Sequence, residues 1–86
     1  MLVIKPNIGD DGQVTPRWAQ VDLVLRREMH QNWDLQQTWA VGGYDKLALV
    51  APEHFGMTAM YRDELDNVTF EFTEQQWIIF ALRWLS

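Results

Sequence analysis

Few side chains in this 86-residue sequence are of the types that perform catalysis or hold a metal ion. There is no cysteine, which excludes thiolate chemistry and disulfide bonds, and the only serine is the final residue, Ser86. The two histidines, His30 and His54, have no spacing that would bring them together with an acidic residue, as a metal site requires. Glycine-rich phosphate loops and dinucleotide fingerprints are absent from the sequence. We therefore predict a protein without enzymatic activity, bound metal or cofactor.

Two other groups of residues are candidates for a partner-binding surface. The first is a set of acidic residues around the predicted last hairpin: Asp63, Glu64, Asp66, Glu71 and Glu74. The same residues could instead be the solvent-exposed end of a hairpin with no role in binding. The second group is the tryptophans, five in total, which a small core cannot easily bury together. We expect Trp33 or Trp39 to be partly exposed, and aromatic anchors beside carboxylates are typical of protein interfaces.

The charge distribution restricts the class of partner. Twelve acidic and seven basic residues give a net charge of −5. Residues 53–86 contain six acids and two bases, a net charge of −4, whereas residues 1–52 contain six acids and five bases, a net charge of −1. Direct nucleic-acid binding is disfavoured, because contacts with phosphates need a basic face. The charge favours instead a protein partner with a basic surface, or serves solubility alone.

The elements that must position these residues are clearest at the end of the sequence. Residues 68–72 alternate between apolar and polar side chains, which predicts a half-buried strand. Thr73 and Gln76 then form a capping box that begins a helix. Within this helix the apolar arc is about 200° wide, where a surface helix needs only about 100°. A helix packed on one sheet face with Ile79 as an isolated exposed residue would explain this, and so would contact with another chain.

The first half of the sequence is less regular. Residues 2–4 predict a short strand, and residues 7–14 predict a loop. Within this loop Asp10-Asp11-Gly12 could suggest a calcium site, but residues typical of a turn explain this sequence better. Thr15 and Pro16 are typical of a helix start, and apolar residues at spacings of three and four predict a helix over 16–31. Alternation within residues 20–26 is compatible with a strand instead, but the cap and the length favour the helix.

Residues 33–51 have the pattern of a β-hairpin. Trp33, Leu35, Trp39 and Val41 share one parity, which predicts a strand over residues 33–41. A Gly-Gly pair at 42–43 suits a tight turn, and residues 44–51 would return as the second strand. Residues 52–56 then predict a loop, and residues 57–63 another strand.

These elements give the order β-α-β-β-β-β-α in a single domain spanning residues 1–86. The short connections predict an α+β fold, a small two-layer sandwich in which two helices lie on a mostly antiparallel sheet of four to five strands. The sequence contains no apolar run of the about 20 residues that cross a bilayer, and no signal-peptide pattern, so we expect a cytoplasmic protein without membrane contact.

Three hypotheses about function follow. The leading one is a small acidic protein that binds another macromolecule, for example an inhibitor of the phage or mobile-element type that masks a basic nucleic-acid-binding surface of its target. The second is a structural subunit of a homo-oligomer or larger assembly, joined through the apolar C-terminal helix. The third is a small-ligand pocket protein in which tryptophans stack on the ligand.

Overall fold

Three helices and three strands make up the part of the chain that the computed structural model describes, residues 1–6 and 16–85. In chain order these are β1 (Leu2–Ile4), α1 (Pro16–Gln31), α2 (Trp33–Phe55), β2 (Ala59–Arg62), β3 (Val68–Phe72) and α3 (Glu74–Trp84). The predicted loop over residues 7–14, its Asp10-Asp11-Gly12 turn and the predicted cap Thr15 lie outside the described residues. Helices and an antiparallel sheet are both present, as the α+β class requires, but the predicted order and number of elements are wrong.

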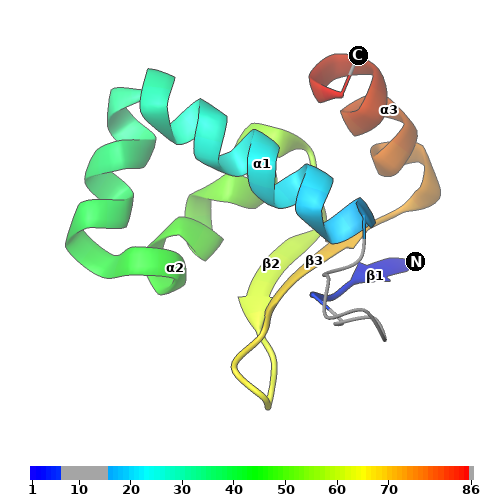
Figure 1. Cartoon of the computed structure of the whole chain (residues 1–86), viewed down its shortest axis with the longest axis horizontal. Helices are drawn as coiled ribbons and strands as arrows, with labels where there is room; N and C mark the ends of the chain where they lie inside the picture. Colours follow the sequence, from blue (N-terminus) through cyan, green and yellow to red (C-terminus); the bar gives the residue numbers. More distant parts are fainter. Residues whose placement is uncertain (7–15, 86) are drawn as a thin grey trace.

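The strands form an antiparallel sheet in the order β1-β3-β2, with β3 in the centre (Figure 1). Ile4 and Met60 lie opposite Phe70 on its two sides, and all three side chains are buried. The neighbouring residues Val3 and Tyr61 are exposed on the other face. Because successive side chains of a strand point to opposite sides, the sheet has one core face and one more open face, with Thr69 of the central strand buried on the latter.

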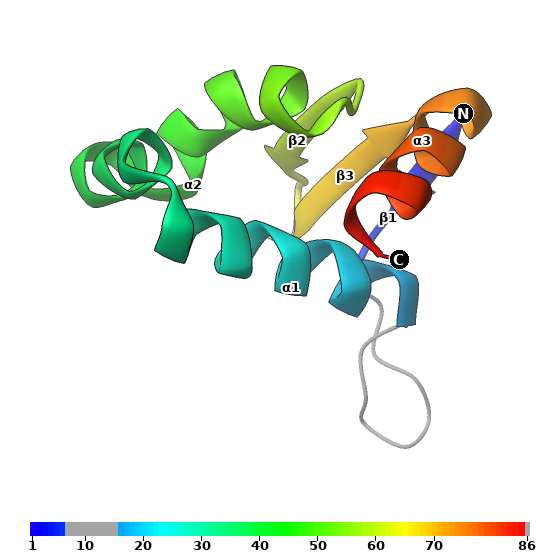
Figure 2. The ribbon, with the colours of Figure 1, turned by 90° about the horizontal axis from the view of Figure 1, so that it is seen from above.

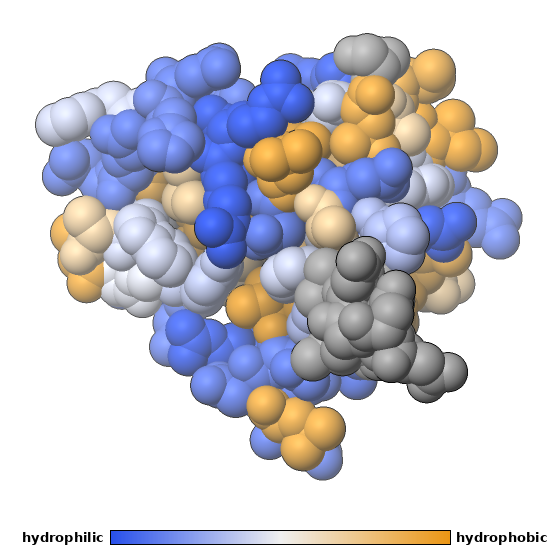
Figure 3. Space-filling view, viewed as in Figure 1, coloured by the Kyte–Doolittle hydropathy of each residue, from blue (hydrophilic) through white to orange (hydrophobic). Residues whose placement is uncertain are grey.

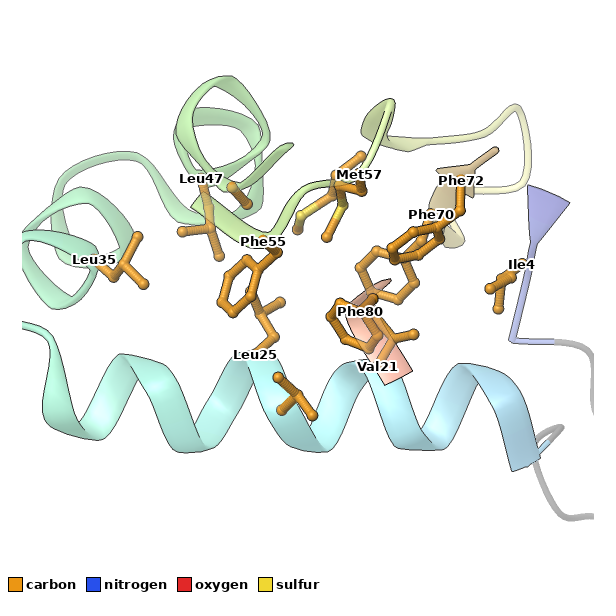
Figure 4. Packing of buried hydrophobic residues seen from close by; sticks show 13 residues of the cluster. Ile4, Val21, Leu25, Leu35, Leu47, Phe55, Met57, Phe70, Phe72 and Phe80 are labelled. Atoms are coloured by element: carbon orange, nitrogen blue, oxygen red, sulfur yellow. The ribbon is translucent and has the colours of Figure 1, made fainter. Parts of the chain in front are cut away.

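Helices α1 and α3 both pack on the core face of the sheet. The Trp18 ring of α1 lies 6.2 Å from the Phe70 ring, and the Phe80 ring of α3 lies 5.1 Å from that of Phe72. Helix α2 packs beside them, against α1 and β2, and its first part lies at the far end of the molecule from α3 (Figure 2). In Figure 4 the buried side chains of all these elements meet above α1, with Leu25 among them.

The predicted helix over residues 16–31 is confirmed. Val21, Val24 and Leu25 are its buried residues, at the three- and four-residue spacing that places side chains on one face of a helix. The alternation that suggested a strand in this segment has no counterpart in the structure. The short strand at the start of the chain and the strand over residues 68–72 are confirmed as well.

The predicted β-hairpin over residues 33–51 is wrong, because this segment belongs to the helix α2. Asn32 caps the helix, with its side-chain oxygen accepting from the Leu35 amide at 3.2 Å. The buried residues Leu47, Ala51 and Phe55 follow one another at intervals of four, which is helical spacing. The parity of residues 33–41 was misleading, since Trp33 and Val41 are 70% and 80% exposed and line no sheet face.

The Gly-Gly pair does redirect the chain, although not as a hairpin turn. Gly43 has φ 60° and ψ −148°, so the helical path is interrupted at this one residue and resumes after it. Only glycine readily adopts that combination, because it has no Cβ. Residues 52–55, predicted as part of a loop, form the last turn of α2, which ends at Gly56 in the left-handed conformation. The next strand is shorter than predicted, covering Ala59–Arg62.

Candidate interaction surface

Helix α3 begins with the capping box that the sequence predicts. The Gln76 amide donates to the Thr73 hydroxyl at 3.0 Å, and the Gln76 side-chain oxygen accepts from the Thr73 amide at 2.9 Å. Glu74 occupies the first turn and Arg83 the last, where their charges oppose those of the helix dipole. This start fixes the rotation of α3, and therefore which of its side chains face the sheet.

Aromatic rings hold the inner side of α3. Phe80 is 2% exposed and contacts Phe72, while Trp77 meets Phe72 edge-on at 5.3 Å. The Arg17 guanidinium of α1 lies 5.2 Å from the Trp77 ring centre, a cation–π contact. At the end of the helix Trp84 lies 5.3 Å from Phe55 of α2. Trp77, Phe80 and Trp84 thus form the inner side of α3.

The outer side of α3 exposes large aliphatic side chains to solvent. Ile78, Ile79 and Leu82 are 59%, 55% and 71% exposed. At 100° per residue they lie within an arc of about 100°, so they form one surface. We call these three residues the α3 outer face, and Figure 3 shows apolar side chains gathered over this helix at the upper right. One of the two interpretations of the sequence had Ile79 as an isolated exposed residue. Ile78 and Leu82 are exposed as well, because the sheet lies against the opposite side of the helix, where Trp77 and Phe80 contact Phe72.

The acidic residues of the β2–β3 turn are engaged in its own structure. Asp63 accepts from the amides of Leu65 and Asn67, both at 2.9 Å, and its other oxygen lies 3.3 Å from the Lys5 ammonium. The Asn67 amide, with the Leu65 amide and Lys5, lowers the pKa of the Asp63 carboxyl against the opposing effect of partial burial. Asp63 therefore acts first as a turn-forming residue.

The remaining acids of the predicted set lie at separate places. In the turn, Asp66 pairs with Arg62 at 3.4 Å and Glu64 is exposed. Glu71 belongs to the open sheet face, where its hydrogen bond with Tyr61 raises the pKa of that phenol. Glu74 lies beyond β3, in the first turn of α3. The predicted acidic set is thus divided between the two ends of β3.

Both tryptophans predicted at the surface are exposed, but on a helix instead of a strand. Trp33, at the start of α2, is 70% exposed. Trp39 is 39% exposed and meets the Tyr44 ring edge-on at 4.6 Å across the interruption at Gly43. The residue of α2 that reaches toward the β2–β3 turn is Tyr44, whose ring lies 5.7 Å from the Arg62 guanidinium, so the two tryptophans and the acids of the turn do not form one cluster.

The histidines occupy helix ends. His30 lies in the last turn of α1, and His54 lies in the last turn of α2, where its Nε2 is 3.2 Å from the Glu28 carboxylate of α1. Among residues 1–6 and 16–85, no three histidine, aspartate or glutamate side chains are placed to share a metal ion. The contact between His54 and Glu28 thus joins α1 and α2.

Comparisons with known proteins identify no relative: neither a family model, nor a curated protein sequence, nor a solved structure matches this chain. None of the described helices is both long enough and apolar enough to cross a bilayer. A functional interpretation must therefore be built from the surface of the molecule itself.

Proposed function

We propose that this domain is a non-enzymatic protein that acts by binding another protein through the α3 outer face. The observation that carries the proposal is the exposure of Ile78, Ile79 and Leu82, each more than half exposed, on a single side of a short capped helix. Contiguous exposed apolar surface of this kind marks interaction sites, since its burial is favourable by about 25 cal/mol per Å².

The charge beside this face supports a partner with basic residues. Glu74, Ile78 and Leu82 follow one another at intervals of four, so the carboxylate lies at one end of the apolar stripe. The C-terminal segment, residues 53–86, carries the net charge of −4. We expect the partner to offer an apolar groove rimmed by lysine or arginine, which would steer association and fix the register. A target that uses such a surface for nucleic acid would be inhibited by the domain.

The test begins with affinity capture from the source cells, using the wild type, Ile78→Glu and Leu49→Glu. Leu49 lies on α2 and is 74% exposed, so Leu49→Glu adds the same charge at similar exposure on a different helix. A partner retained by wild type and Leu49→Glu but lost by Ile78→Glu supports the proposal. Equal capture by all three proteins contradicts it.

Two further measurements separate this proposal from its alternatives. The association rate of the captured partner should fall with added salt, and Glu74→Lys should slow it more than Glu64→Lys in the β2–β3 turn. Asp63 is left unchanged in these variants, because its carboxylate holds the turn. If sedimentation shows that the purified chain forms a dimer that Ile78→Glu dissociates, a second copy occupies the α3 outer face and a foreign partner is ruled out there.

A further inference from the structure

A depression on the opposite side of the molecule from α3 has a different chemical character from the rest of the surface. Its lining residues come from the end of α1 and the first part of α2. The junction of these two helices is at the left of Figures 1 and 2. The volume of the depression is about 550 Å³, within the range of small-molecule sites. The residues that line it are Arg26, Met29, His30, Gln36, Trp39 and Tyr44. None of them is acidic, although the whole chain carries a net charge of −5.

Two aromatic rings form a corner in this depression. Trp39 and Tyr44 meet at 4.6 Å with their planes 82° apart, and Trp39 retains 39% exposure. A planar ring placed in such a corner can stack on one ring while presenting its edge to the other, and aromatic pairs favour both arrangements. Met29 adds a polarizable apolar side chain to the same lining. The corner therefore suits a flat aromatic group better than an aliphatic one.

The polar groups around this corner are mainly hydrogen-bond donors. Nε of Arg26 donates to Asp22 at 2.9 Å, which leaves the two terminal nitrogens of the guanidinium for other acceptors. The Gln36 amide nitrogen donates to the His30 carbonyl at 3.2 Å. The Trp39 indole N–H and the Tyr44 hydroxyl are two further groups that can donate a hydrogen bond, and the Arg62 guanidinium lies 5.7 Å from the centre of the Tyr44 ring. Such donors favour an anion, and a guanidinium matches the geometry of a carboxylate.

From these observations we infer that the depression between α1 and α2 binds a small planar aromatic carboxylate. The ring lies in the corner of Trp39 and Tyr44, and the carboxylate meets Arg26 at the rim. The site is independent of the α3 outer face, so the two can be tested separately. The interruption of α2 at Gly43 is what builds it, because that residue separates Trp39 from Tyr44 and lets their rings meet at an angle.

The experiment titrates 2-naphthoate into the ¹⁵N-labelled full chain and follows the five tryptophan indole resonances by NMR. We expect saturable shifts of the Trp39 indole resonance, with that of the exposed Trp33 unchanged. Neutral 2-naphthamide and non-aromatic cyclohexanecarboxylate should each bind at least about tenfold more weakly, since each lacks one of the two recognised groups.

Matched variants assign the binding to these residues. Arg26→Gln should weaken the binding of 2-naphthoate by about tenfold. The same substitution at the neighbouring Arg27, which does not line the depression, should leave the affinity unchanged. Trp39→Leu should abolish saturable binding of 2-naphthoate, followed by the backbone amide resonances of the depression, and Trp33→Leu should leave the affinity unchanged. Absence of saturation, equal affinity for the amide, or equal effects of the two arginine variants would each overturn the inference.

Discussion

Helices α2 and α3 both expose large apolar side chains, but they distribute them differently. On α3 the residues Ile78, Ile79 and Leu82 form one continuous face. On α2 the most exposed apolar residues, Trp33, Val41 and Leu49, are eight positions apart, with Trp39 and Val50 less exposed, and Gly43 interrupts the helix between Val41 and Leu49. Trp33 and Val41 differ in direction by about 80°, and the interruption redirects the helix before Leu49, so these residues do not share one face.

The comparison shows that the amount of exposed apolar surface is less informative than its continuity. A single partner could cover the α3 outer face at once, whereas the exposed residues of α2 are isolated in the way that is normal for soluble proteins. What α2 offers instead is the aromatic corner that its interruption creates. One helix is suited to a flat contact, and the other to a small ligand.

The largest expected effect tests whether α3 has distinct inner and outer sides. Phe80→Ala should lower the free energy of unfolding by about 3–5 kcal/mol, because it leaves a cavity against Phe72. Ile78→Ala, two residues away on the exposed side, should change it by less than about 0.5 kcal/mol. Urea denaturation of both variants provides the measurement. Similar losses for the two would mean that the outer face is part of the core.

The next effect concerns the interruption of α2. Gly43→Ala should cost about 1–3 kcal/mol, because φ 60° with ψ −148° is a conformation that L-residues rarely adopt. The cause is backbone strain, since a Cβ added at Gly43 would meet no atom within 4 Å. A chemically synthesised chain with D-alanine at position 43 is the control, and it should remain as stable as the wild type. If both alanine forms destabilise equally, the cause is not the backbone conformation.

Gly43 also explains why the sequence pattern led to the wrong prediction of a β-hairpin over residues 33–51. A Gly-Gly pair between segments with alternating apolar residues is typical of a hairpin, but here Gly43 interrupts a helix and no hairpin turn forms. The signals for the helix were weaker: the cap at Asn32 and the spacing of Leu47, Ala51 and Phe55. Pro52 argued against a helix, yet it lies near the end of α2. The burial of Leu47, Ala51 and Phe55 in the core favoured the helical pattern over the strand pattern.

The cap of α3 allows a smaller and sharper test. Thr73→Ala should lower the free energy of unfolding by about 1 kcal/mol, because the backbone amide of Gln76 would lose its acceptor. Thr38→Ala is a matched control within α2, where the hydroxyl donates to the Asp34 carbonyl at 2.8 Å, a group that the helix already satisfies. Its effect should be close to zero in the same denaturation measurement. An unchanged midpoint for Thr73→Ala would show that the capping box does not stabilise α3.

The sequence separation of the residues involved explains why the cap was predictable and the candidate surface only partly so. The capping box depends on residues three positions apart, so the sequence contains all of it. The exposure of Ile78 and Leu82 depends on which distant elements pack against α3, and Phe55 of α2 and Phe72 of β3 contact its inner residues Trp77, Phe80 and Trp84. The acidic residues are close in sequence, but a strand of five residues separates the β2–β3 turn from Glu74. Local patterns were informative, whereas long-range placement was not.

The smallest expected effect is on the pH dependence of stability, and it tests whether Asp63 is structural. Its pKa is lowered from the ordinary value of 3.8, chiefly by the amide of Asn67. The folded state therefore favours the ionised form, so this contribution is fully present above pH 3.8 and is lost as the pH falls through the lowered pKa. Asp63→Asn should flatten the acid side of the stability curve, measured by urea denaturation at successive pH values. Asp66→Asn, at a side chain 78% exposed, should keep the wild-type slope. If Asp63→Asn kept that slope too, the turn would not depend on the carboxylate, and Asp63 would return to the residues available for a partner.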